Sequence, residues 1–414
     1  MHKELFQAED ILQMRLIAGF TRGLEEVVYE VYVPNGEQDD FIPELWSVPV
    51  NGGVPKSLAP GGCAPAFSPN RQELAYLQDG QLWLRTGDRC APVSPKELVI
   101  SAFRWSGDGG CFAVVVNNPP LGHQNTPQAI RDIVYKTDEA HGLLDGSYRS
   151  VGILDKSGCF TRLSPEKQDS FEPVWAADCS GIFYFTRAHG GTRAFQTDLW
   201  YASAGGEPRA ITEDGRFMSD IPVVVSPDGS SIFYAAIQRG SEGGTMLSLF
   251  RMPAQGGTGS CLLAPEGICS GVSSLISNKN TYGKMNPCLQ MDREGKNLYF
   301  HSLSNGSSNL YRLSLSGTLE QVTAGEHAVL GYLPPENGEL LLLRCDGSSL
   351  PELFHVCLRT GAYTQLTAEN EWLSRMCVSP PEKCGSNPGT KQPKSAHGWY
   401  RQFRQQEKHA TRPF

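Results

Sequence analysis

The sequence has no long apolar run. Nowhere do 18 consecutive apolar residues occur, which argues against a membrane-spanning helix. The opening segment, MHKELFQAEDILQMRLIAGF, is interrupted by Gln13 and Arg15 and lacks the apolar stretch of a signal peptide. We therefore expect a cytoplasmic protein that does not bind membranes.

An excess of positive charge is also missing. The 36 Lys and Arg residues are outnumbered by 44 Asp and Glu, for a net charge of −8, so a general nucleic-acid binder is disfavoured. The twelve cysteines include no CxxC pair and no compact framework. We interpret them as buried free thiols in a reducing compartment rather than as disulfides.

Catalytic motifs are absent as well. The chain has no Gly-x-Ser-x-Gly nucleophile elbow, no HExxH metal motif, no P-loop and no GxGxxG motif that opens a helix. Serines such as Ser226, in the SPDG sequence at 226–229, lie in repeated turns and are interpreted as structural. We therefore predict no catalytic residue, no cofactor-binding residue, no metal ligand and no cofactor.

Two half-motifs alternate along the chain. The first is an apolar residue, a short polar turn and an apolar strand, as in FSPNRQELAYL; its copies begin at Phe20, Phe67, Trp105, Trp175, Val225, Met291 and Leu333. The second opens with a pair such as Leu-Trp and often ends in Leu-Thr; its copies begin at Glu44, Gln81, Tyr148, Asp198, Ser248, Asn309 and Glu352. Strict alternation of the two predicts seven repeating units.

Each half-motif predicts a hairpin of two short strands, because its turn is rich in residues such as Pro-Asp-Gly. Two hairpins form a four-stranded sheet, which buries both faces only by stacking on its neighbours. The predicted fold is therefore all-β, a seven-bladed β-propeller of four-stranded antiparallel blades over residues 20–378. The strands at Leu45–Trp46, Leu82–Trp83 and Leu199–Trp200 are expected between the sheets.

Two ends and two long excursions depart from the repeat. Residues 7–18 have apolar residues at helical spacing, so we expect a helical segment over 1–19 that packs on the rim. Residues 379–414 are rich in Pro, Lys, Arg and Gln and predict an irregular tail. The excursions at 117–148 and 262–287 predict loops or extended hairpins.

Several segments, taken in order, resemble one family of peptidases. They are the FSPN and VSPDG turns, the opening AEDILQMRLI, the segment RDIVYKTDEAHGLLDGSYRSVGILD at 131–155, and HGWY at 397–400. Together they resemble the propeller half of the prolyl oligopeptidase superfamily, in its acylaminoacyl-peptidase and dipeptidyl-aminopeptidase-like branch. The usual Ser-Pro-Asp-Gly of the first blade is absent at residues 20–25.

The resemblance implies a substrate-gating propeller without chemistry of its own. In the family, the Ser, Asp and His of the triad lie downstream in a hydrolase domain of about 200–250 residues. Residues 379–414 resemble its start, so the resemblance implies a chain truncated before that domain. Whether the chain is an enzyme stays open. Its expected partners are peptides, or a hydrolase domain or subunit, on one propeller face.

One alternative is a stand-alone scaffold propeller that binds a protein or peptide. A propeller enzyme with a site in its central channel is disfavoured, because the repeats supply Ser, Pro, Asp and Gly in turns rather than convergent ligands or bases.

Overall fold

The computed structural model describes residues 4–120, 146–187, 197–213, 221–236, 247–264, 285–304 and 306–378. Most of both excursions and the whole of the tail at 379–414 lie outside these ranges. The described chain is β-structure throughout, apart from two 3-10 helices, η1 (Ala8–Gln13) and η2 (Glu371–Arg375). The all-β prediction is confirmed.

Strands consecutive in the chain form antiparallel sheets of four. The first three sheets contain β1 Leu16–Arg22, β2 Glu26–Asn35, β3 Asp40–Pro49 and β4 Lys56–Pro60; β5 Gly62–Phe67, β6 Glu73–Gln78, β7 Gln81–Thr86 and β8 Arg89–Pro92; and β9 Ile100–Trp105, β10 Cys111–Asn118, β11 Tyr148–Asp155 and β12 Phe160–Arg162. The next two contain β13 Asp169–Trp175, β14 Ile182–Arg187, β15 Thr197–Ala202 and β16 Arg209–Ala210; and β17 Val224–Val225, β18 Ser231–Ala236, β19 Ser248–Pro253 and β20 Ser260–Leu263.

The remaining eight strands are hydrogen-bonded as one sheet. They are β21 Leu289–Met291, β22 Asn297–Ser304, β23 Ser307–Ser314, β24 Leu319–Gln321, β25 Ala328–Glu336, β26 Glu339–Asp346, β27 Ser349–Cys357 and β28 Ala362–Gln365. A parallel pairing of Ser308 with Ala328 joins the two halves of this sheet. Hydrogen bonding therefore yields five sheets of four strands and one of eight, and it does not confirm a count of seven blades.

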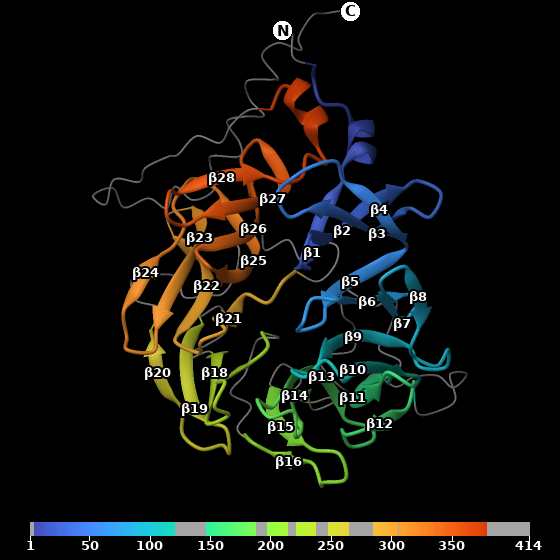
Figure 1. Cartoon of the computed structure of the whole chain (residues 1–414), viewed down its shortest axis with the longest axis vertical. Helices are drawn as coiled ribbons and strands as arrows, with labels where there is room; N and C mark the ends of the chain where they lie inside the picture. Colours follow the sequence, from blue (N-terminus) through green and yellow to red (C-terminus); the bar gives the residue numbers. More distant parts are fainter. Residues whose placement is uncertain are drawn as a thin grey trace, which may run out of the picture.

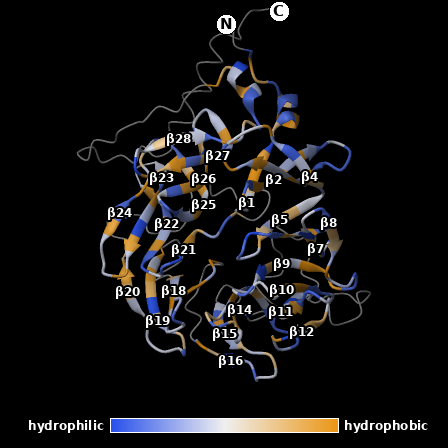
Figure 2. Cartoon of the chain, viewed as in Figure 1, coloured by the Kyte–Doolittle hydropathy of each residue, from blue (hydrophilic) through white to orange (hydrophobic). Residues whose placement is uncertain are grey.

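The sheets follow one another around a centre, and η1 and η2 lie at the same side of the molecule (Figure 1). Apolar residues are concentrated along the strands, and hydrophilic residues dominate many of the turns (Figure 2). Hydrophobic clusters fill the spaces between neighbouring groups of four strands. One of them joins β1–β4 to β25–β28, through residues that include Phe20, Tyr29, Leu343 and Leu353. The first and last groups of strands therefore pack against each other and close the ring.

The turn between the first and second strand of a sheet, here called the first turn, follows one hydrogen-bonding pattern. In five sheets a backbone N–H bonds the carbonyl three residues earlier, and the donor is Arg71, Gly109, Cys179, Gly229 or Gly295. Each of these donors has a positive φ, which costs glycine little and other residues more.

First turns of successive sheets touch each other. A Cβ placed on Gly109 would lie 3.5 Å from Pro69, and one on Gly229 would lie 3.7 Å from Ala177. At Gly295 the space is tighter, with Pro227 only 2.7 Å from such an atom. These contacts join the first turns of neighbouring sheets on one face of the molecule, which we call the turn face.

The Leu-Thr ending of the second half-motif has a structural role. Thr212 Oγ1 accepts the backbone N–H of Leu199 and lies 3.3 Å from Asp198 Oδ1. Thr367 repeats this arrangement with Leu353 and Glu352. The threonine hydroxyl thus links the end of the outermost strand to the start of the third strand by hydrogen bonds. This explains why the second half-motif begins with a polar residue and Leu (as in Asp198–Leu199 and Glu352–Leu353) and ends with Leu-Thr or Ile-Thr.

The Leu-Trp prediction is confirmed for leucine and corrected for tryptophan. Leu45, Leu82 and Leu199 are at most 1% exposed. The tryptophan that follows each of them is only partly buried. Successive side chains of a strand point to opposite faces, so the two residues of each pair face different neighbours.

The predicted N-terminal helix is present but shorter than the expected range. The 3-10 helix η1 is six residues long, and β1 already begins at Leu16, within the range expected to be helical and before the predicted propeller boundary at residue 20. Ile11 and Leu12 are 50% and 56% exposed rather than packed on the rim. Ile17 is buried because it pairs with Val31 of β2. A short segment with a few apolar residues can form either a helix or a strand. Here residues 16–22 form a strand because β2 is available as a pairing partner.

The ten cysteines of the described residues are free. Burial was predicted for them, but Cys345 alone among these ten is fully buried, and Cys90, Cys159, Cys261 and Cys377 are exposed.

Candidate functional site

The turn serines are the first residues to consider, because a serine peptidase needs a reactive hydroxyl. Ser226 Oγ donates a 2.5 Å hydrogen bond to Asp228 Oδ1 and accepts the backbone N–H of Ser231 at 3.0 Å. The bond from Ser226 lowers the pKa of Asp228 to about 2, which makes this carboxylate a poor general base. Ser226 therefore holds its turn together and is not activated.

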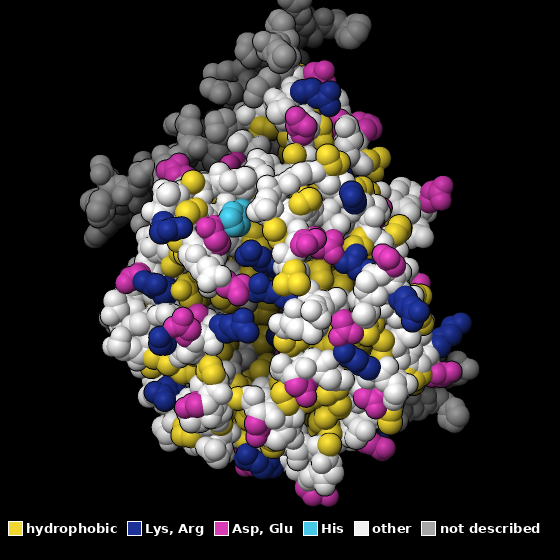
Figure 3. All heavy atoms as spheres, viewed as in Figure 1, with side chains coloured by type: hydrophobic (Ala, Val, Ile, Leu, Met, Phe, Trp, Pro, Cys, Tyr) yellow, Lys and Arg dark blue, Asp and Glu magenta, His cyan; other side chains and the backbone are white. Residues whose placement is uncertain are grey.

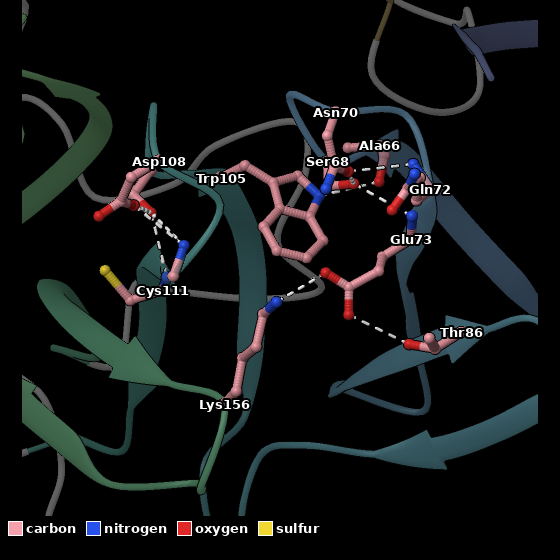
Figure 4. Close-up of polar contacts among 12 residues, drawn as sticks. Ala66, Ser68, Asn70, Gln72, Glu73, Thr86, Trp105, Asp108, Cys111 and Lys156 are labelled. Atoms are coloured by element: carbon pink, nitrogen blue, oxygen red, sulfur yellow. Dashed lines mark hydrogen bonds and ion pairs between the residues drawn. The ribbon is translucent and has the colours of Figure 1, made fainter. Parts of the chain in front are cut away.

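The equivalent turns in the second and third sheets are built in the same way (Figure 4). Ser68 Oγ donates to Asn70 Oδ1 and accepts the N–H of Glu73. Between the two sheets, Trp105 Nε1 donates to the Ala66 carbonyl at 3.0 Å, and Lys156 Nζ lies 2.6 Å from Glu73 and over the Trp105 ring. These polar groups join neighbouring sheets and have a structural role.

The three histidines in the described ranges belong to β22, to the connection before β25, and to β27. His301 is buried, its Nδ1 has no described hydrogen-bond partner, and burial lowers its pKa to about 4. Burial likewise lowers the pKa of His327. His355 Nε2 lies 3.0 Å from Glu339. None of the three is in a first turn with the serines described above.

The two chain ends meet on the face opposite the first turns, which we call the end face. Glu4 forms a parallel bridge with Met376, and Phe6 stacks on Trp372 with ring centroids 6.2 Å apart. The backbone N–H of Glu4 bonds the Arg375 carbonyl at 3.0 Å. Segments from opposite ends of the described chain therefore form a single structure.

A polar network lies beneath this contact. Arg15 Nε donates to Glu369 at 2.5 Å, and Tyr29 Oη donates to the other oxygen of the same carboxylate at 2.6 Å. Asn370 bonds the backbone of Arg15 in both directions, at 2.9 and 2.7 Å. Glu352 accepts the N–H of Asn370, and burial raises its pKa. We call Arg15, Tyr29, Glu352, Glu369 and Asn370 the clasp.

Beside the clasp, the N-terminal segment exposes apolar side chains. Leu5 is 71% exposed, and Phe6, Ile11 and Leu12 are between 42% and 56% exposed. Four large apolar residues within eight positions form an unusually apolar surface for a short polar helix and its approach. Their position next to Val378, where the described chain ends, makes this segment a candidate contact surface.

The turn face has a cavity of about 380 Å³ between the fourth and fifth sheets, lined by Ala177, Asp178, Tyr201, Arg209 and Asp228 among others. Asp178 accepts hydrogen bonds from Ser180, just as Asp228 accepts them from Ser226 and Ser230. Both carboxylates therefore stabilise their own turns.

Within the described ranges, no three His, Cys, Asp or Glu side chains come together as a metal site requires. The helices of the same residues are too short to cross a membrane.

Sequence reasoning predicted no site residues and did not find the clasp. Glu352 and Thr367 belong to a recognised repeat, but nothing in the sequence distinguished them from their counterparts. Arg15 lay in the segment expected to be helical. The repeat does show a polar residue and Leu at the start of the second half-motif and Leu-Thr at its end. This pattern predicts a contact within one sheet, and it does not predict a contact between the two ends of the described chain.

Comparison with known proteins identifies the fold class. Neither a family model nor a curated protein matches the chain. Solved structures do match: the acylaminoacyl peptidase of Pyrococcus horikoshii aligns with a TM-score of 0.68 at 16% identity, over 90% of this chain and 55% of that one. A puromycin-hydrolysing peptidase of Mycobacterium tuberculosis aligns with a TM-score of 0.63 at 12% identity, over 89% and 56%.

A third match is to an isolated domain. The β-propeller domain of the Trilobed protease from Pyrococcus furiosus aligns with a TM-score of 0.58 at 15% identity, over 86% of this chain and 97% of that one. The chain therefore has a β-propeller fold. This fold is similar to that of the Trilobed protease propeller domain and of about half of each peptidase named above, in line with the resemblance noted in the sequence. It spans about half the length of the complete peptidases that it matches.

Proposed function

We propose that this chain is the substrate-gating propeller portion of a prolyl-oligopeptidase-type serine peptidase and that its end face receives a hydrolase domain or subunit. The observation that carries the proposal is the coverage: 90% of this chain aligns with only 55% of an acylaminoacyl peptidase. The first-turn serines described above are bonded within their turns, so the chemistry is assigned to the partner. The chain alone is expected to be inert.

We further propose that the ring has seven blades. Division of the eight-stranded sheet at the Ser308–Ala328 pairing produces seven groups of four strands. Each of seven hydrophobic clusters joins two neighbouring groups, which supports seven interfaces around a closed ring.

The proposed docking surface is the exposed apolar segment beside the clasp. Association of proteins buries apolar surface, and such patches on otherwise soluble domains mark contact sites. Leu5 lies close to the point from which residues 379–414 continue, because its neighbour Glu4 accepts the backbone N–H of Cys377. A hydrolase domain or subunit that docks there would meet the apolar side chains of this segment first.

Photo-cross-linking tests this proposal. The full chain is expressed in its native organism with a photoreactive amino acid in place of Leu12. We expect this group to capture a protein whose serine reacts with a fluorophosphonate probe. The matched control carries the same group at Val54, which is 80% exposed in the β3–β4 turn of the opposite face and should capture no such protein. The purified chain should neither react with the probe nor hydrolyse acyl-peptides.

Two outcomes would contradict the proposal. Stoichiometric labelling of the purified chain on one serine, lost when that serine becomes alanine, would make the chain itself the enzyme. Capture at Leu12 of a partner that lacks a probe-reactive serine would favour the alternative, a stand-alone scaffold propeller.

A further inference from the structure

Four charged side chains from separate parts of the ring meet on the turn face. Arg22 ends β1, Arg71 lies in the first turn of the second sheet, Arg293 lies in the β21–β22 turn, and Glu336 ends β25. The first strands lie toward the centre of the molecule (Figure 1), so these four side chains lie toward the centre of the turn face. Basic side chains also gather beside the hollow at the centre of the face in Figure 3.

Two of the arginines pair with one carboxylate, and the third acts on it through its charge. Arg71 Nη2 lies 2.5 Å from Glu336 Oε2, and Arg293 Nη1 lies 3.7 Å from Glu336 Oε1. The hydrogen bond from Arg71, with the positive charges of Arg71, Arg22 and Arg293, lowers the pKa of Glu336. Three guanidinium groups around one carboxylate leave an excess of positive charge, in a chain whose net charge is −8.

Arg22 has unused hydrogen-bonding capacity. Its Nε is buried and has no hydrogen-bond partner among the described residues. No ion pair of the described residues includes Arg22, although it lies close enough to act on Glu336 electrostatically. A buried donor without a partner carries a desolvation cost, which a bound acceptor would offset.

Arg71 occupies a position where three other sheets use glycine and the fourth uses Cys179. Its φ is +61°, and the equivalent residues Gly109, Gly229 and Gly295 have φ between 69° and 72°. A side chain in this conformation costs about 1 kcal/mol relative to glycine. The turn would form more easily with glycine, so Arg71 lowers the stability of the turn that brings its guanidinium group to Glu336.

We propose that Arg22, Arg71 and Arg293 form a carboxylate-binding site toward the centre of the turn face, and that this site takes an acidic side chain or the C-terminal carboxylate of a peptide. Glu336 occupies the site from within until such a ligand displaces it. Guanidinium groups bind carboxylates through parallel N–H donors, which gives both affinity and orientation. The choice of a peptide as the ligand rests on the proposed function, whereas the anion site itself does not.

Fluorescence anisotropy with a labelled, blocked Glu-rich hexapeptide tests the site, with the matched Gln-rich hexapeptide as the uncharged probe. The native chain should prefer the acidic peptide, and this preference should weaken as salt rises. Arg71→Gly should reduce affinity about tenfold while the turn still folds, because glycine suits its φ. Glu336→Gln should increase affinity severalfold, because it removes the internal competitor. Arg209→Ala, on the same face outside the cluster, should change nothing.

Opposite results would overturn the inference. If the cluster only fastens the ring, Glu336→Gln lowers the thermal midpoint and leaves peptide affinity unchanged or weaker. Equal binding of the acidic and neutral peptides would likewise show that the cluster is not a carboxylate-binding site. The assay needs no hydrolase, so its failure is separate from that of the cross-linking experiment, and a positive result would stand even if the chain proved to be a scaffold.

Discussion

The turn face and the end face of this ring are built by different rules. On the turn face the chain makes the same turn in five sheets, and each turn touches the turn of the next sheet. On the end face the decisive contacts join residues as far apart in sequence as Arg15 and Glu369. A repeat can encode contacts between successive units, but the first and last units of this ring share no strand. Their contact needs residues that occur once.

The largest expected effect comes from breaking the clasp. Glu369→Ala removes the partner of Arg15 Nε and of the Tyr29 hydroxyl, and both groups are largely shielded from solvent. We expect the free energy of unfolding to fall by ~2–4 kcal/mol, measured by urea denaturation. Glu294→Ala, which breaks the exposed pair with Lys296, is the control and should have no measurable effect. Equal losses in the two variants would show that the clasp does not hold the ring closed.

A second prediction concerns Glu30, which is 1% exposed and accepts the N–H of Ala64 from the second sheet at 3.1 Å. Burial raises its pKa to about 7. The folded protein therefore binds a proton that the unfolded chain releases near pH 4.5. The stability from this group is complete below that pH and is lost as pH rises through 7.

Glu30→Gln removes this titration. Relative to the native chain, the variant should be more stable at pH 8 than at pH 5, by a difference of ~1–3 kcal/mol. Denaturant midpoints at the two pH values measure it. A difference that does not depend on pH would contradict a raised pKa for this carboxyl.

The smallest effect tests the turn face. Gly295 and Gly361 both have φ +70°, but Gly295 lies against Pro227 and Gly361 has open space. Substitution of either by alanine introduces the same backbone strain, about 1–2 kcal/mol. Gly295→Ala adds a steric clash and should lower the thermal midpoint further than Gly361→Ala does. Identical midpoints would mean that the turns do not form a tight ring.

Much of the fold was predictable because the repeat is dense in local information. The FSPN and VSPDG turns specify hairpins, and the Leu of each Leu-Trp pair marks the buried face of its strand. Leu45, Leu82 and Leu199 are buried as expected. The start of β1 was not predictable, because the apolar residues from Ile11 to Ile17 suit a helix equally well. The half-burial of Trp200 depends on which neighbouring sheet covers it, and a single strand carries no information about that.

The candidate site was far less predictable. Arg15, Glu369 and Asn370 have ordinary sequence neighbours and acquire their roles only from each other. Arg71 is the partial exception: alignment of the first half-motifs places an arginine where three other copies have glycine, and this irregularity could have been noticed. Its partner, Glu336, still comes from a different sheet.

By itself, the sequence determined the class of fold, since alternating short hairpins with Pro, Gly, Ser and Asp turns leave stacking of small sheets as the way to bury both faces. The tertiary structure alone decided how the ring closes and which charges meet at its centre. Hairpins depend on residues a few positions apart, whereas closure and the arginine cluster depend on the accumulated position of every sheet between the first and the last. No local pattern encodes that sum.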